Sequence, residues 1–417
     1  MKLFIVLDGI ADRPCIALEN LTPLEAAKTP NLDFLTKFSK LGYCYVVDKD
    51  VAPESDTAVI SLLGYNPYKQ YTGRGPLEAL GAKIKLETGD LALRCNFGTL
   101  SEGKLIDRRA GRTLTTEEAS ELSEEINTRI KLSHHFIFKN TVDHRGVLLI
   151  KGPELSGNIS NTDPAYKKEG PIAKANENFG EKVLQSKPLD NKKSSKTSAE
   201  LINEFVKQSY TVLKDHPINI KRKEKNLLPA NVILTRDAGA SLPQFEKKHN
   251  WAILANMPLE KGIARVAGIN ILSFERLKLK TNNLYKNLQK NLILEIKEAK
   301  KHIKRGYFET YYIHFKETDI PGHDNKPIEK QKMIEILDKK FFSFLKKLIK
   351  KYPETKIIIT ADHSTPCSIR AHSSDSVPVL LYSEGSGNSQ RFTEEESKQG
   401  ALGELKGQEL LKKLNFE

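Results

Sequence analysis

KLFIVLDG, residues 2–9, decides the fold: it is an apolar, strand-like run that ends in an aspartate, Asp8. Two later apolar runs also lead to an aspartate: TYYIHF (310–315) before Asp319, and KIIIT (356–360) before Asp362. Ligands of an open parallel sheet gather outside the carboxyl ends of its strands. If the three strands are neighbours, the sequence predicts an α/β sheet with three carboxylates in one crevice.

Histidines and a serine accompany these aspartates. The candidate site residues are Asp8, Ser55, Asp319, His323, Asp362, His363 and His372. Carboxylates held this close together repel one another and take up protons unless cations lie between them. We therefore expect a site for two divalent metal ions. Mixed carboxylate and imidazole ligands suit Mn²⁺, the expected ion, better than Ca²⁺, and Mg²⁺, Co²⁺ or Zn²⁺ would also serve.

Ser55 is the candidate nucleophile because it precedes an apolar stretch and opens an expected helix. A serine is a weak nucleophile until a base or a metal removes its proton. Two adjacent metal ions would do this and would also neutralise charge on a transferred phosphoryl group. A serine in this position is otherwise an ordinary helix N-cap, so its catalytic role depends on the other motifs.

The length of 417 residues favours two domains. The metal-type motifs lie at both ends of the chain, and a segment of different character separates them. We expect one α/β domain with the metal-type motifs in residues 1–85 and 226–417, with a second domain inserted at 86–225. Within the insertion, residues 186–198 have the composition of a linker, and a helix is expected from 199 to 213.

Composition narrows the class of protein. The net charge is +13, but the lysines are spread along the chain and form no basic stripe interleaved with aromatic residues, so we expect no nucleic-acid partner. No apolar run approaches the roughly 20 residues that cross a bilayer, so no membrane association is expected. The four scattered cysteines form no CxxC pair, which favours a reducing cytoplasm. The oligomeric state is left open.

Motifs along nearly the whole chain match one family. They are LDGIADRP (7–14), TPLEAAKTPNLD (22–33), SDTA (55–58), LGYNP (63–67), YTGRGPLEA (71–79), DRRAGR (107–112), KETD (316–319) and ADHSTPC (361–367). In these motifs the sequence resembles the cofactor-independent phosphoglycerate mutases, in the form first associated with archaea, within the alkaline phosphatase-like metalloenzymes. The resemblance implies an alkaline phosphatase-like α/β metal domain with a smaller inserted α/β domain.

The resemblance also implies an activity. Such an enzyme interconverts 3-phosphoglycerate and 2-phosphoglycerate, in glycolysis and gluconeogenesis, without 2,3-bisphosphoglycerate. Ser55 would become phosphoserine. One metal ion would be held by Asp8, Ser55, Asp362 and His363, and the other by Asp319, His323 and His372. The inserted domain would hold the glycerate and exclude water, because water that reached the phosphoserine would turn the enzyme into a phosphatase.

Basic residues within the resemblance are candidates for binding the substrate. Guanidinium groups bind carboxylate and phosphate bidentately, so Arg108, Arg109 and Arg112 are candidate contacts for a small phosphorylated acid. Arg236 and Lys261 are candidate phosphate-facing cations of the metal domain.

Three positions depart from the family pattern: Glu54, Glu317 and Pro321 stand where a glycine, a small residue and a more flexible residue are usual. None removes a proposed ligand, but Glu54 and Pro321 leave the rate and the exact substrate open. The metal ligands alone would equally serve a metal-dependent phosphomonoesterase, or a mutase for another small phosphorylated metabolite. A protein that binds metal or metabolite without catalysis is the alternative from a different class.

Overall fold

The computed structural model describes residues 1–169, 172–176, 180–275, 277, 283–383, 387 and 389–417. The chain forms two compact units. Unit 1 comprises residues 1–69, 246–256 and 268–417, and unit 2 comprises residues 70–245 and 257–267. The helix α4 (Pro67–Gln70) lies where the chain first passes from unit 1 to unit 2. The assignment of residues 86–225 to an inserted substrate-binding domain remains a prediction.

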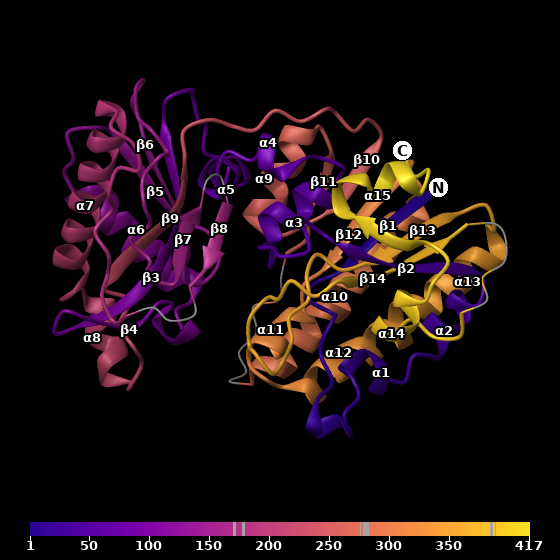
Figure 1. Cartoon of the computed structure of the whole chain (residues 1–417). Helices are drawn as coiled ribbons and strands as arrows, with labels where there is room; N and C mark the ends of the chain where they lie inside the picture. The colour runs from indigo at the N-terminus through magenta and orange to yellow at the C-terminus, as the bar shows by residue number, and fades with distance from the viewer. Residues whose placement is uncertain (170–171, 177–179, 276, 278–282, 384–386, 388) are drawn as a thin grey trace. The chain divides into compact units, whose positions relative to one another are not determined.

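The described residues of unit 1 form an eight-stranded sheet (Figure 1). Its strands, in spatial order, are β11 (Asn270–Leu272), β10 (Trp251–Leu254), β12 (Thr310–Phe315), β1 (Lys2–Leu7), β13 (Lys356–Thr360), β14 (Val377–Tyr382), β2 (Ser39–Tyr45) and β15 (Gly403–Lys406). The strands β11, β10, β12, β1 and β13 run parallel, whereas β14 is antiparallel to both of its neighbours. The expected α/β class is confirmed.

The three strands that precede the aspartates are neighbours, as the sequence predicts. The central strand β1 pairs in parallel with β12 on one side and with β13 on the other. In this register Val6 lies opposite His314 of β12 and Thr360 of β13. The carboxyl ends of the three strands therefore lie at one edge of the sheet, and the segments that carry the three aspartates leave from there.

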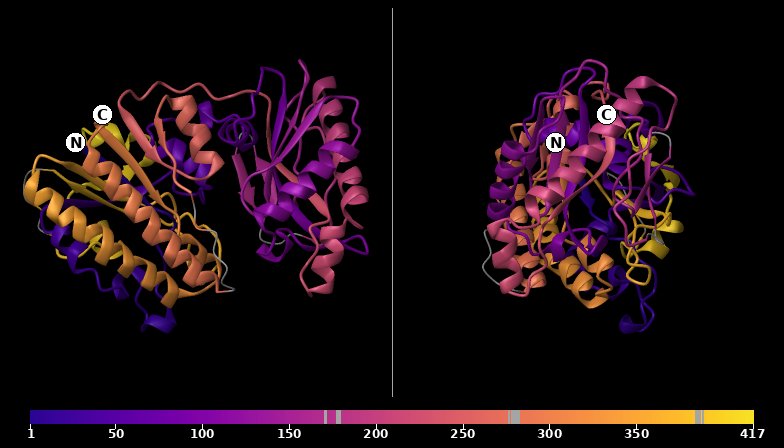
Figure 2. Two further views of the ribbon diagram at one scale, coloured as in Figure 1. Left: turned by 180° about the vertical axis from the view of Figure 1, so that it is seen from behind. Right: turned by 90° about the vertical axis from the view of Figure 1, so that its left-hand side faces the viewer.

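Helices cover the sheet of unit 1. Its helical segments are η1 (Ile16–Leu18), α1 (Pro23–Ala26), α2 (Pro30–Thr36), α3 (Ser55–Leu62), α10 (Leu284–Arg305), α11 (Asp319–His323), α12 (Pro327–Leu337), the π-helical turn η3 (Asp338–Phe342), α13 (Ser343–Lys351), α14 (Glu394–Lys398) and α15 (Gly407–Lys413). Figure 2 shows the long helix α10 running beside the continuous helix formed by α12, η3 and α13. The apolar residues of that second helix, including Leu337, Phe341 and Leu345, are fully buried.

Unit 2 contains a five-stranded antiparallel sheet within the described residues. It comprises β3 (Leu91–Ser101), β4 (Lys104–Asp107), β5 (Phe136–Asn140), β6 (Arg145–Ile150) and β9 (Val232–Gly239), and a separate two-stranded ribbon is formed by β7 (Tyr166–Glu169) and β8 (Ile172–Ala175). The helical segments are α5 (Arg74–Gly81), η2 (Ala110–Arg112), α6 (Thr116–Arg129), α7 (Lys193–Leu213), α8 (Pro217–Glu224) and α9 (Pro258–Ala267).

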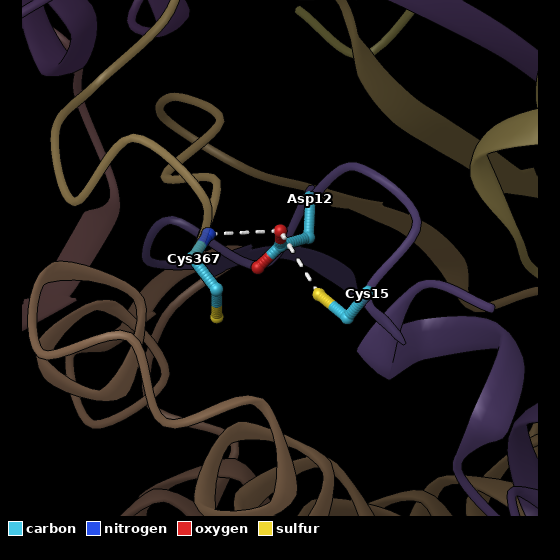
Figure 3. Close-up of side chains that lie close together, drawn as sticks. All are labelled: Asp12, Cys15 and Cys367. Atoms are coloured by element: carbon cyan, nitrogen blue, oxygen red, sulfur yellow. Dashed lines mark hydrogen bonds between the residues drawn. The ribbon is translucent and has the colours of Figure 1, made fainter. Parts of the chain in front are cut away.

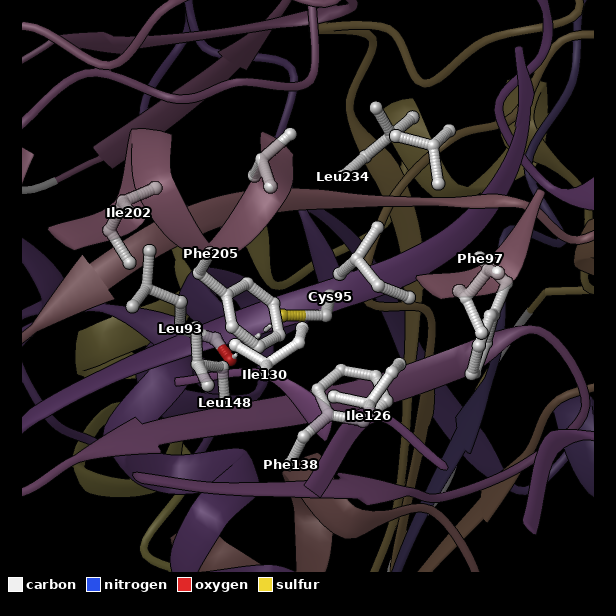
Figure 4. Packing of buried hydrophobic residues seen from close by; sticks show 14 of the residues in the cluster. Leu93, Cys95, Phe97, Ile126, Ile130, Phe138, Leu148, Ile202, Phe205 and Leu234 are labelled. Atoms are coloured by element: carbon white, nitrogen blue, oxygen red, sulfur yellow. Dashed lines mark hydrogen bonds between the residues drawn. The ribbon is translucent and has the colours of Figure 1, made fainter. Parts of the chain in front are cut away.

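One hydrophobic core joins α6 and α7 to this sheet (Figure 4). The rings of Phe97, Phe138 and Phe205 meet in it, with centroids 5.6 and 5.9 Å apart. Such aromatic pairs stabilise a core beyond the area that they bury. A capping box of Thr115 and Glu118 begins α6.

The predicted linker at 186–198 is wrong for its second half. The helix α7 begins at Lys193, and Ser195 and Ser198 are fully buried within it. Their hydroxyls meet the segment around Ser156: the Ser195 hydroxyl lies 3.0 Å from the Ser156 hydroxyl, and the Ser198 oxygen accepts from the Ser156 amide at 2.9 Å. These tertiary contacts thus stabilise a helix in a stretch whose composition is typical of a linker.

Candidate functional site

Two carboxylates and an imidazole converge at the carboxyl ends of β1, β12 and β13. The His314 Nε2 lies 3.4 Å from the Asp8 Oδ2 and 3.3 Å from the Asp362 Oδ2. The Lys316 ammonium lies 2.7 Å from the same oxygen of Asp8. Asp8, His314 and Asp362 are all buried, with at most 3% of each exposed. We name Asp8, His314 and Asp362 the first acid group.

Asp319, His363 and His372 form a second group of possible ligands, which we name the second acid group. Asp319 opens the short helix α11, and its carboxylate lies 3.3 Å from the His323 Nε2 and 3.8 Å from the His372 Nε2. The rings of His363 and His372 stack with centroids 3.6 Å apart. The Thr365 hydroxyl donates to Asp319 at 2.8 Å and lies 2.9 Å from the His363 Nδ1.

His363, a member of the second acid group, also lies next to the first. Its Nε2 is 3.3 Å from the Asp8 Oδ1 and 3.4 Å from the Asp362 Oδ2, while its ring stacks on His372. The structure therefore brings together all six of the predicted aspartate and histidine ligands within unit 1. The division of these residues between two metal ions, which the resemblance implies, remains a prediction.

Ser55 is the first residue of α3 and is half-buried. The residues before it contact the second acid group, because the Pro53 carbonyl lies 2.8 Å from the His372 Nδ1 and the Glu54 carboxylate lies 3.8 Å from that nitrogen. Glu54, the residue that departs from the family pattern, therefore faces a candidate ligand. The amino end of a helix favours a bound phosphate through its free N–H groups and its dipole.

The donors in these groups fit a divalent metal ion. Within the described part of the chain, buried atoms without a hydrogen-bond partner include the Asp8 Oδ1, the Asp362 Oδ2, the His363 Nε2 and both ring nitrogens of His314. An unsatisfied buried polar atom costs about 1–3 kcal/mol. A cation among them would satisfy several at once, and carboxylate oxygens with imidazole nitrogens are ligands that suit Mn²⁺ or Zn²⁺.

Mutual attraction shifts the pKa values of these groups. Burial would raise the pKa of Asp319, but the nearby imidazoles of His323, His363 and His372 outweigh burial and hold that pKa well below its ordinary value. Burial would lower the pKa of His323, but Asp319 outweighs it and raises this pKa to about 9. Asp319 is thus held in the ionised form, which is the form that binds a metal.

A third cluster lies beside the first turn after β1 and contains Asp12, Cys15 and Cys367 (Figure 3). The Asp12 Oδ1 accepts from the Cys367 amide at 2.9 Å, and the buried Lys330 ammonium lies 2.8 Å from the Asp12 Oδ2. Burial raises the pKa of Cys367, and it raises the pKa of Cys15 to about 11. Protonated thiols beside an ammonium make a structural ion-pair site and a poor metal site.

The predicted substrate-binding residues lie in unit 2. Arg108 holds Asp163 bidentately at 2.6 and 2.7 Å, and its guanidinium lies 5.0 Å from the centre of the Tyr166 ring. The Arg236 guanidinium lies 3.6 Å from the same ring. Arg112, in contrast, is exposed, at the end of the short η2 helix.

Two of these residues carry a pKa that burial lowers. The pKa of Arg109 falls to about 10 through burial and the repulsion of nearby Arg112. Lys261 is half-buried on α9, and burial together with Arg265 lowers its pKa. Arg236 and Lys261, which the sequence assigned to the metal domain, both belong to unit 2.

Arg94 is a further buried basic residue of unit 2, and the sequence analysis did not single it out. Arg94 pairs with Arg236 in the β3–β9 register and shares Glu78 with Arg74, at 3.5 and 2.6 Å from that carboxylate. Burial, with Arg74 and Arg236 nearby, lowers the pKa of Arg94 to about 9. The only sequence signal was an arginine inside the apolar strand LALRCNF (91–97).

His314 and Lys316 were missed for a similar reason. His314 lies within the apolar run of β12, where a histidine is more often a core residue, and Lys316 follows that run directly. Only the pairing of β12 with β1 shows that both side chains meet Asp8.

Comparisons with known proteins agree with this geometry. A family model described as 2,3-bisphosphoglycerate-independent phosphoglycerate mutase matches residues 37–219. Relatives with that name from Pyrococcus abyssi and Aeropyrum pernix are each 37% identical, over 98% and 97% of this chain and 95% and 96% of their own lengths.

Two solved structures are similar over their full length. A protein from Pyrococcus horikoshii matches with a TM-score of 0.75 and 31% identity, covering all of this chain and 97% of that one. A cofactor-independent phosphoglycerate mutase from Thermoplasma acidophilum matches with a TM-score of 0.59 and 29% identity, covering all of this chain and 98% of that one. In sequence over its whole length, and in fold, the chain belongs to the 2,3-bisphosphoglycerate-independent phosphoglycerate mutase family.

Proposed function

We propose that this enzyme interconverts 3-phosphoglycerate and 2-phosphoglycerate through a phosphoserine at Ser55, with two divalent metal ions at the acid groups. The observation that carries the proposal is the 37% identity to mutases of this name over nearly the whole chain. The position of Ser55 at the start of α3, beside the contacts of Pro53 and Glu54 with His372, supports its role as nucleophile.

The metal ligands would be Asp8, Ser55, Asp362 and His363 for one ion and Asp319, His323 and His372 for the other. Bound divalent ions would lower the pKa of the serine hydroxyl and stabilise negative charge on the phosphoryl oxygens. Mn²⁺ is the proposed ion, because the donors are carboxylate oxygens and imidazole nitrogens. The half-buried Lys316 ammonium, 2.7 Å from the Asp8 Oδ2, would help to orient the Asp8 carboxylate.

The reaction needs two transfers at Ser55. The Ser55 oxygen forms a bond to phosphorus as the bond from phosphorus to the substrate's 3-oxygen breaks, and the glycerate 3-oxygen takes a proton. The 2-hydroxyl of the glycerate then loses its proton and attacks the phosphoserine, which frees Ser55. No phosphate is lost, provided that water is excluded between the two transfers.

The basic residues of unit 2 are proposed to bind the acid substrate. Arg74, Arg94 and Arg236 are buried; Arg74 and Arg94 lie at the Glu78 carboxylate, and Arg236 lies at Asp237. Guanidinium groups match the geometry of carboxylate and phosphate, which are the anionic groups of the proposed substrate. Arg108, Arg109, Arg112 and Lys261 are proposed as further contacts, and residues 86–225 as the segment that carries most of them.

The proposed location is the cytoplasm. The four cysteines are free and buried, which suits a reducing compartment. No helix among the described residues has the length and apolar character that crossing a membrane requires.

The phosphoserine step is tested with Ser55→Ala. We expect this variant to lose isomerisation by at least a thousandfold while it keeps the thermal stability of the parent protein. Ser343→Ala is the matched control and should keep full activity, because among the described residues the Ser343 hydroxyl, at the start of α13, donates to the Lys339 carbonyl. Mass spectrometry of the quenched parent enzyme should find phosphate on the peptide that contains Ser55. Full activity of Ser55→Ala would refute the mechanism.

A further inference from the structure

His314 is the member of the first acid group that the ligand assignment above leaves out. Its side chain is 2% exposed, and it lies on β12 between the two carboxylates that follow β1 and β13. The ring of Tyr312 meets it edge-on, with centroids 6.1 Å apart, which limits the orientations open to the imidazole.

The contacts of His314 differ from those of a histidine that is satisfied by hydrogen bonds. Its Nε2 approaches both the Asp8 Oδ2 and the Asp362 Oδ2 at 3.3–3.4 Å, yet neither ring nitrogen makes a hydrogen bond within the described residues. A metal ion with donors at about 2.1 Å holds neighbouring ligand atoms about 3.0–3.4 Å apart. The Nε2 is thus spaced from each carboxylate oxygen as two ligands of one ion are, and ligand atoms of all three residues lie within 4.8 Å of one another.

The charges around His314 also favour a neutral imidazole as a ligand once a divalent ion is bound. Lys316 already provides a cation for Asp8, and a protonated His314 would repel a divalent ion held by Asp8 and Asp362. A neutral imidazole has one ring nitrogen with a lone pair. The Nε2, which points between the two carboxylates, is placed to direct that lone pair at the ion.

We propose that His314 is a nitrogen ligand of the divalent ion held by Asp8 and Asp362, in addition to the ligands that the family motifs supply. The inference rests on the metal site of the proposed function. It places part of that site inside strand β12, in a residue that belongs to no metal motif.

The test measures Mn²⁺ binding by calorimetry on the chelator-treated full chain. In His314→Gln, we expect one of the Mn²⁺ binding steps to weaken by roughly 100-fold or more, beyond what loss of a mere outer-shell partner usually costs. His314→Glu, which returns an oxygen donor to this place, should recover most of the affinity. His302→Gln, on α10 and away from the acid groups, is the control and should bind like the parent.

A second readout is the visible absorption of the Co²⁺-loaded proteins, which changes when a nitrogen ligand is lost. Loss of Mn²⁺ affinity of roughly 100-fold or more in His314→Gln, with a changed Co²⁺ spectrum, would support the inference. A smaller loss of affinity, tighter binding, or an unchanged spectrum would overturn it and leave His314 as an ion-pair partner. Thermal unfolding of each metal-free variant identifies any that fail to fold, and His314→Glu then decides.

Isomerisation assays on the same samples separate this inference from the proposed function. A parent protein that isomerises phosphoglycerate, with Mn²⁺ affinity unchanged in His314→Gln, would refute only the role of His314. A parent that binds Mn²⁺ through His314 but isomerises nothing would refute only the proposed function.

Discussion

Single side chains at the site depend on partners that are remote in sequence. Asp8 contacts His314, Lys316 and His363, all more than 300 residues further along the chain. In unit 2, Arg94 and Arg74 share the Glu78 carboxylate, and Arg108 forms an ion pair with Asp163. The role of each residue is therefore set by which strands pair.

At this scale, Arg112 provides a test of substrate binding. Arg112 is exposed and carries no metal contact, so Arg112→Ala should remove a charge-assisted contact with the substrate and leave the metal groups intact. Such contacts contribute about 1.5–3 kcal/mol, which predicts a KM for 3-phosphoglycerate raised about tenfold or more. Steady-state kinetics with Mn²⁺ present measure it.

The matched control is Arg129→Ala, on the exposed face of α6, where within the described residues the arginine pairs with Glu125 one turn away. Its KM should equal that of the parent. An unchanged KM in Arg112→Ala would remove Arg112 from the substrate site, and weakened Mn²⁺ binding there would show that the change is not confined to substrate.

The residue types at the strand ends were enough to predict a large part of the candidate site. The remaining site residues were not predicted, because they lie inside apolar strands. Aspartates and histidines at strand ends were visible, because polar residues that interrupt apolar runs there are rare unless they are functional. His314 and Arg94 lie inside strands, where a sequence pattern assigns them to the core. Only the paired strands reveal which charges face them.

Among the elements, the helix α9 shows how backbone packing positions a candidate residue. A methyl group on Gly262 would lie 1.9 Å from the Leu77 carbonyl oxygen of α5, and one on Gly81 would lie 1.7 Å from the Pro258 carbonyl oxygen. The two helix backbones can meet only because these residues lack a side chain. That contact fixes α9, and with it Lys261.

Gly262→Ala tests this packing. The added methyl must push α9 away from α5, and overpacking of this kind costs about 1–3 kcal/mol. We expect a lower melting temperature by calorimetry and a raised KM for 3-phosphoglycerate, because Lys261 moves with the helix. Gly180→Ala, where no described atom lies within 4 Å of the added methyl, should match the parent in both measurements. A Gly262→Ala protein as stable as the parent would contradict the account.

Elements with strong local signals were predictable from sequence. The apolar strands β1, β12 and β13 have the expected bounds to within a residue or so. The first turns of α7 were not predicted, because their serines and lysines are stabilised in the helix by contacts with the Ser156 segment, which composition cannot show. In these first turns of α7, tertiary packing outweighs a weak local propensity for helix.

In the whole molecule, the candidate metal ligands and the candidate substrate-binding residues lie in different units. The candidate aspartate and histidine ligands belong to unit 1, and the candidate arginines together with Lys261 belong to unit 2. The family and the α/β fold were predictable, because motifs at both ends of the chain carry them. The course of the chain between units was less so, because residues 257–267 join unit 2 after the chain has returned to unit 1 at 246–256.

The most direct test of the central claim follows phosphoglycerate isomerisation on chelator-treated protein, with and without added Mn²⁺. The conversion of 3-phosphoglycerate to 2-phosphoglycerate is measured in the absence of 2,3-bisphosphoglycerate, with free phosphate followed in the same samples. The account predicts isomerisation that depends on added Mn²⁺ and releases little phosphate. Phosphate release without isomerisation would make the protein a phosphomonoesterase, and equal isomerisation with and without metal would contradict the metal-dependent mechanism.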